Sequence, residues 1–227
     1  MERHFDQELS ELRDQLLLMA SLVQENLRRA MRMLVERDSS MMDLVEREDD
    51  QIDELEMQID EICIKMLAIR SPVASDLRLI TMAMKISVDL ERIGDQAVNI
   101  ARRARDLNTE PQLKALVDIP RMANIAQDMI KDALDAFVFN KPDLARKIPP
   151  RDHEVDELNR QLCRELTSFM LEDPGTITRA LNLMFVAKFI ERIADHASNI
   201  GEEVVYLAEG KDIRHHAEET EAQKSLS

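Results

Sequence analysis

The sequence predicts an all-α protein built as two tandem three-helix bundles that are related by an internal repeat. Residue types that favour helices dominate the 227 positions, with 14 Met but only four Gly. Apolar residues recur every three or four positions, which is the spacing of a helix packed on one face. Frequent turns and alternating apolar residues, which an all-β protein needs, are missing. One apolar stripe comprises Ile52, Leu55, Ile59, Ile62, Met66 and Ile69.

Breaks in these stripes predict six helices. Ser71-Pro72 and Asp173-Pro174 each combine a capping residue with a proline suited to the first helical position. Pro149-Pro150 interrupts the fifth helix, so its regular part is expected to begin near Arg151. The expected helices span residues 6–36, 42–70, 73–107, 116–139, 143–172 and 175–208.

An internal repeat relates the two halves of the chain. Residues 19–25 match residues 122–128 at an offset of 103 positions, and residues 91–93 match residues 191–193 at an offset of 100. A three-residue deletion before the last helix explains the change. Because the matches include polar residues in a fixed order, a shared apolar period does not account for them. We expect one three-helix repeat in residues 1–110, a second in 111–209, and a polar, disordered tail in 210–227.

Charge and apolar content exclude several classes of partner. The formal net charge is −15, whereas a protein that binds nucleic acid or an anionic membrane needs a basic surface. The longest uncharged stretch, residues 15–24, is far shorter than the ~20 residues of a membrane-spanning helix. The charged N-terminus does not resemble a signal peptide. Cys63 and Cys163 lie in helical patterns and are expected in the core. These features predict a cytoplasmic protein with no membrane-spanning helix of its own.

Four acidic motifs are the candidate functional residues. Each has a carboxylate, three intervening residues and a second carboxylate, so both lie on one helix face about 5–6 Å apart at Cβ. Like charges at this spacing repel, and a bound cation would compensate. Carboxylates are hard oxygen ligands that suit Mg²⁺, Mn²⁺, Ca²⁺ or ferric iron more than a soft metal. The predicted metal-binding residues are Asp49, Asp53, Glu91 and Asp95 in the first half, and Asp152, Asp156, Glu191 and Asp195 in the second.

Two other interpretations of these motifs stay open. The carboxylates could form a solvated acidic face, or Arg92 and Arg192 could neutralise them. Asn99 and Asn199 extend the same rows and could donate hydrogen bonds to them. His153 and His196 have no histidine counterpart in the first half, so we interpret them as surface or supporting residues.

No catalytic motif is found in the sequence. A ferritin-like di-iron oxidase needs Glu-x-x-His motifs, and no His here has Glu three positions before it. Gly-rich phosphate loops and Gly-x-Ser-x-Gly elbows are also missing. We therefore expect a protein that is not an enzyme.

The duplicated acidic motifs resemble those of the PhoU family. The segments that carry the resemblance are 89–95, 190–196 and the turn at 71–78, and the resemblance extends over residues 5–208. The second-half turn at 173–179 keeps only a Pro and an Arg, so a partner contact through this turn is expected in the first half alone.

The resemblance implies a function that the residues alone do not reveal. By this resemblance the chain is expected to be a cytoplasmic, dimeric, non-enzymatic negative regulator of phosphate uptake and of the phosphate-starvation response. PhoU proteins are also implied to bind metal at the acidic motifs, and to reach the membrane only through partners. Their implied partners are the ATPase subunit of the phosphate ABC transporter and a sensor histidine kinase. The alternatives are a metal-storage bundle without a signalling role and a structural coiled coil.

Overall fold

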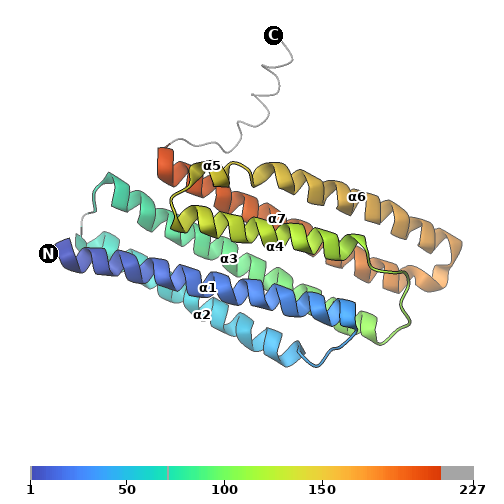
Figure 1. The fold of residues 1–227 in the computed structure, drawn as a ribbon. Coiled ribbons are helices and arrows are strands. Elements are labelled where there is room, and N and C mark those ends of the chain that lie inside the picture. Colours follow the sequence, from blue (N-terminus) through green and yellow to red (C-terminus); the bar gives the residue numbers. More distant parts are fainter. Residues whose placement is uncertain (1, 71, 211–227) are drawn as a thin grey trace, which may run out of the picture.

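The computed structural model describes residues 2–70 and 72–210, and the regular secondary structure in this part of the chain is all helical, with no strand (Figure 1). The predicted all-α class is confirmed. A short helix, α5 (Pro142–Ala145), and a 3₁₀ turn, η1 (Pro174–Thr176), lie between longer elements. The six long helices are α1 (Glu2–Glu36), α2 (Met42–Arg70), α3 (Ala74–Asn108), α4 (Asp118–Val138), α6 (Pro149–Glu172) and α7 (Ile177–Glu209).

Prolines punctuate the helices differently from the prediction in two places. Pro149 and Pro150 open α6 in its first turn, where a missing N–H costs nothing, and the break falls at residues 146–148. Helix α3 begins at Ala74, after Val73 rather than at Pro72. Ser71 and the predicted tail beyond Gly210 lie outside the described residues. Asp173 does cap, since its carboxylate accepts a hydrogen bond from the Gly175 N–H at 2.8 Å.

Helices α1 and α4 are both followed by a residue in the left-handed backbone region. Arg37 has φ 56° and Asn140 has φ 49°, and the two positions are related by the offset of 103. Asn adopts this backbone conformation readily, whereas for Arg it is energetically unfavourable. The Arg37 guanidinium compensates by donating to three backbone carbonyls, those of Leu107, Asn108 and Glu110.

The two repeats join along their third helices. Helices α1–α3 form one bundle, and α4, α6 and α7 form the other. Figure 1 shows α3 and α7 running in opposite directions where the bundles meet. One hydrophobic core continues through both halves and includes Ile86, Ile93, Ile190 and Ile193. The repeat therefore makes a single body.

Contacts of polar side chains at this junction occur at positions that the internal repeat relates to one another. Lys85 on α3 forms an ion pair with Glu203 on α7 at 3.0 Å. At the positions 100 residues away, Arg103 lies over the ring of Phe185, 4.9 Å from its centroid. The exchange of roles between the two helices shows that an approximate two-fold axis relates the repeats.

Two further sequence predictions concern the burial of the cysteines and the lack of a membrane-spanning helix. Cys63 is fully buried, and burial raises the pKa of its thiol to about 12. Cys163 is only half-buried, so the prediction that both cysteines lie in the core is confirmed for Cys63 but only partly for Cys163. None of the described helices is both long and apolar enough to cross a membrane.

Candidate functional site

The first-half carboxylates meet where α2 and α3 pack side by side. Helix α2 supplies Asp49 and Asp53, and α3 supplies Glu91 and Asp95. Gly94 allows the close approach, because a Cβ at this position would lie 3.2 Å from Asp49 Oδ1. The predicted pairing of two motifs on neighbouring helices is therefore found.

Electrostatics connect the four carboxylates of this first cluster. The pKa of Asp49 is raised to about 7, first by burial and then by the negative charges of Asp53, Asp95, Asp50 and Glu91. Burial is also the largest cause of the raised pKa values of Asp53 and Glu91, with Asp95 next in both. The cluster thus concentrates negative charge that water only partly screens.

The second cluster repeats the arrangement on α6 and α7. Asp152 and Asp156 lie on α6, and Glu191 and Asp195 lie on α7. The pKa of Asp152 is raised to about 6, first by burial and then by the charges of the other three carboxylates, while His153 opposes the rise. Asp152 Oδ1 is shielded from solvent and accepts no hydrogen bond from the described residues. A buried carboxylate oxygen without a partner is costly.

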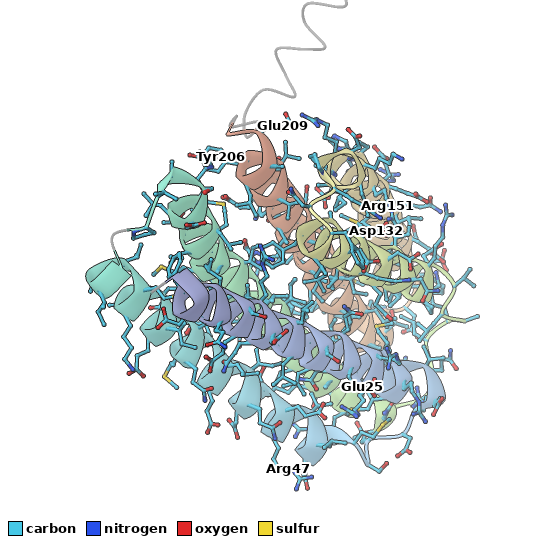
Figure 2. All side chains as sticks on the ribbon, turned by 60° about the vertical axis from the view of Figure 1, so that its left-hand side comes forward. Glu25, Arg47, Asp132, Arg151, Tyr206 and Glu209 are labelled. Carbon is cyan, nitrogen blue, oxygen red and sulfur yellow. The ribbon has the colours of Figure 1, made fainter. Side chains whose placement is uncertain are left out.

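Basic residues approach the second cluster more closely than the first. Lys188 Nζ lies 2.5 Å from Glu191 Oε2, although the angles do not make a hydrogen bond. Arg151, next to Asp152 in the chain, turns instead to α4, where its guanidinium donates to Asp132 Oδ2 at 2.7 Å (Figure 2). Position 88, which corresponds to Lys188, is Val in the first repeat.

The arginines expected to neutralise the carboxylates do not do so. Arg92 and Arg192 are exposed and form no ion pair with any described residue, and Arg92 only slightly opposes the raised pKa of Glu91. Asn99 and Asn199 donate no hydrogen bond to the carboxylates within the described part of the chain. For the first cluster, whose four carboxylates form no ion pair with any described residue, this leaves a cation or solvent as the source of compensation.

The two histidines occupy different surroundings. His153 is exposed on α6. His196 Nδ1 lies 2.9 Å from Asp89 Oδ1 and so connects α7 with α3 across the repeat junction. Sequence analysis missed this contact, because Asp89 has a Phe, not an acidic residue, at its repeat-related position.

The donor chemistry fits a hard cation, but the side chains are not gathered around one. Among residues 2–70 and 72–210, no three His, Cys, Asp or Glu side chains converge as a ready-made ligand set. The raised pKa of Asp49 and the unpartnered Asp152 Oδ1 both indicate missing positive charge. A metal ion would require the carboxylates of a cluster to turn towards one point.

Comparison with known proteins agrees with the internal repeat. The model of the PhoU domain matches the chain twice, over residues 16–104 and 119–204. A curated relative from Pseudomonas aeruginosa, named phosphate-specific transport system accessory protein PhoU homolog, is 42% identical over 95% of this chain and 89% of its own length. The Escherichia coli protein of that system, named PhoU, is 36% identical over 93% of this chain and 88% of its own length.

Solved structures give the same result. The crystal structure of PhoU from Pseudomonas aeruginosa matches with a TM-score of 0.89 and 42% identity, covering 91% of this chain and all of that one. The structure of the phosphate transport system regulatory protein PhoU from Streptococcus pneumoniae matches with a TM-score of 0.85 and 30% identity, covering 92% and 98% of the two chains. With its two matched domains, its duplicated carboxylate clusters and this fold, the chain belongs to the PhoU family.

Proposed function

We propose that this protein is a negative regulator of phosphate uptake and of the phosphate-starvation response. It acts in the cytoplasm as a homodimer, through contacts with the ATPase subunit of the phosphate ABC transporter and with a sensor histidine kinase. The names of relatives that match almost the whole chain carry this proposal. The role is one of binding, without a chemical step catalysed by this chain.

The two carboxylate clusters supply the physical basis for such contacts. Asp50, Asp53 and Asp95 are exposed, so the first cluster presents its charge to solvent. A basic surface on a partner would be attracted to it, and attraction between exposed charges weakens with salt. Complex formation with the kinase should therefore weaken as ionic strength rises, and binding that ignores salt would contradict this mode of docking.

Bound metal would set the charge of this surface. In the first cluster Asp49, Asp53, Glu91 and Asp95 would hold Mg²⁺, Mn²⁺ or ferric iron, and Asp152, Asp156, Glu191 and Asp195 would do so in the second. The ion would supply positive charge that the neighbouring side chains lack. The carboxylates, in turn, would release their remaining protons when the ion binds.

The test is affinity purification of the tagged protein from phosphate-replete cells, with mass spectrometry and elemental analysis of the same preparation. We expect the transporter ATPase or the sensor kinase to co-elute, with few metal ions per chain. A matched purification of the Asp53→Lys, Asp95→Lys variant, in which the formal charge of the first cluster is neutralised, should recover less of the partner. Recovery of neither partner, together with many metal ions per chain, would favour the metal-storage alternative.

A further inference from the structure

The junction between the repeats, where α3 packs against α7, has two ends that the internal repeat makes equivalent. In the part of the chain that the structure describes, a segment fills one of these ends but not the other. At one end α3 finishes, α7 begins, and the connecting segment 109–117 crosses between the repeats (Figure 1). At the other end α3 begins and α7 finishes, and no such segment crosses among the described residues. The approximate two-fold axis maps one end onto the other.

Arginines hold the connecting segment at the filled end. Arg179 Nε lies 3.5 Å from the carboxylate of Glu110, in an ion pair without a hydrogen bond, so this Nε is shielded and lacks an acceptor among the described residues even at the filled end. The Arg179 guanidinium also donates to the Pro111 carbonyl at 3.2 Å. Arg37 donates to the carbonyl of Glu110 as well. The filled end therefore shows how this fold binds an extended segment with one carboxylate.

The open end has a pocket lined by the repeat-related residues. Leu34, Arg37 and Leu107 line the small space left beside the segment, and Phe137, Asn140 and Leu207 line the pocket at offsets of 103, 103 and 100. The volume left open is about 360 Å³ in the pocket but only about 20 Å³ beside the segment. The pocket therefore lies at the position that the repeat relates to the connecting segment.

Two unpaired arginines line this pocket. Arg78, within one residue of the repeat position of Arg179, has its Nε shielded from solvent with no acceptor. Arg13 reaches the pocket from α1. Neither guanidinium forms an ion pair or a hydrogen bond with any residue that the structure describes, although Asp76 also lines the pocket. The pocket therefore holds two arginines that pair with none of its other lining residues, Asp76 included.

We propose that this pocket binds an extended, acidic segment of a partner protein, with one carboxylate on Arg78 and Arg13 and an apolar neighbour against Phe137 and Leu207. The filled end is the template: Glu110 meets Arg179 while Pro111 follows it. Charge-assisted hydrogen bonds to guanidinium fix the carboxylate, and the apolar wall accepts the adjoining residue. This docking point is opposite in sign to the carboxylate clusters and lies on a different part of the molecule.

The test uses a fluorescein-labelled synthetic peptide that copies residues 108–116 of this chain, titrated with the full-length protein and followed by fluorescence anisotropy. Arg78→Gln should weaken binding by roughly ten- to hundred-fold, because a charge-assisted hydrogen bond is lost. Arg78→Lys should weaken it less, since charge remains but the planar fork is gone. Arg164→Gln, which removes an exposed, unpaired arginine from α6, is the matched control and should bind like the wild type.

Four outcomes would overturn the proposal. The first is equal binding by wild type and Arg78→Gln when thermal melting shows that both are folded, and the second is equal binding of a peptide with Gln in place of its Glu. The third is displacement of the peptide by inorganic phosphate at constant ionic strength. The fourth is much tighter binding by a chain that ends at Gly210. The third would indicate a small-anion site and the fourth a site for the chain's own C-terminal residues. The test contains neither the transporter nor the kinase, so its failure would leave the regulatory proposal standing, and the reverse also holds.

Discussion

The two carboxylate clusters have the same motifs and the same helix placement, yet their surroundings differ. In the first, Gly94 brings α3 close to Asp49, and the pKa of Asp49 reaches about 7. In the second, Ala194 stands at the corresponding place, Lys188 pairs with Glu191, and the pKa of Asp152 reaches about 6. Duplicated motifs therefore do not guarantee equal affinity for a cation, because neighbouring charges and backbone distance set the local field.

The largest expected effect concerns bound metal. Asp49→Asn with Asp53→Asn should lower the affinity of the first cluster for Mn²⁺ by at least about a hundred-fold, the upper end of the loss from a single outer-shell change. Helicity should persist, because neither side chain belongs to the core. Titration calorimetry and elemental analysis measure the loss, with Asp152→Asn and Asp156→Asn as the matched pair. An unchanged stoichiometry would remove the first cluster from the list of metal sites.

The next effect is on stability without metal. Folded Asp49 holds its proton more tightly than the unfolded carboxyl group, whose ordinary pKa is 3.8. Its contribution to stability is therefore complete below pH ~4 and is lost as the pH rises towards 7. Asp49→Asn cannot ionise, so it should exceed wild type by about 1–2 kcal/mol at pH 8, after allowance for solvent screening, and match it near pH 4.

Chemical denaturation in EDTA across this pH range provides the measurement. Asp152→Asn should show a smaller gain at pH 8, since the pKa of Asp152 rises only to about 6. Equal gains in stability at pH 8 by the two variants would show that the clusters do not differ electrostatically in this way. A loss of stability in Asp49→Asn at pH 8 would mean that the ionised carboxylate has a stabilising partner.

The smallest effect comes from exchanging one neighbour between the repeats. Val88→Lys should lower the metal affinity of the first cluster by about three-fold, and Lys188→Val should raise that of the second by a similar factor. A partly exposed ion pair is worth about 0.2–1 kcal/mol, which sets this magnitude. Calorimetry on both variants tests the reciprocity, and changes in the same direction would show that Lys188 does not cause the difference.

Much of the fold could be predicted because helices and their ends follow local chemistry. The apolar period placed all six long helices, and α2 has the predicted bounds of residues 42–70. Pro149-Pro150 was misjudged, since proline breaks a helix in its interior but opens one in its first turn, and the sequence does not show which applies. The extra turn α5 follows from the same ambiguity.

The carboxylates that make up the candidate site could be predicted from the sequence, but only some of the residues that surround them could. The i, i+4 spacing and the repeat identified which carboxylates would share a helix face. Lys188 and Glu191 lie three positions apart on α7, so this spacing could have predicted their pairing. The turning of Arg151 towards Asp132 and the open pocket at Arg78 depend instead on packing between different helices. Comparing each residue with its repeat-related position would have pointed to Val88 and Lys188. Metal binding itself stays a prediction.

The approximate two-fold axis at the junction of α3 and α7 has a consequence for how such a protein can arise and diversify. A homodimer of one three-helix unit must make every contact twice with identical residues. Once both units belong to one polypeptide, each copy of a contact can change alone, as Lys85 with Glu203 and Phe185 with Arg103 have done. Gene fusion thus allows asymmetric specialisation: one end of the junction is closed by the covalent tether that fusion created, and the other is left free for a new ligand.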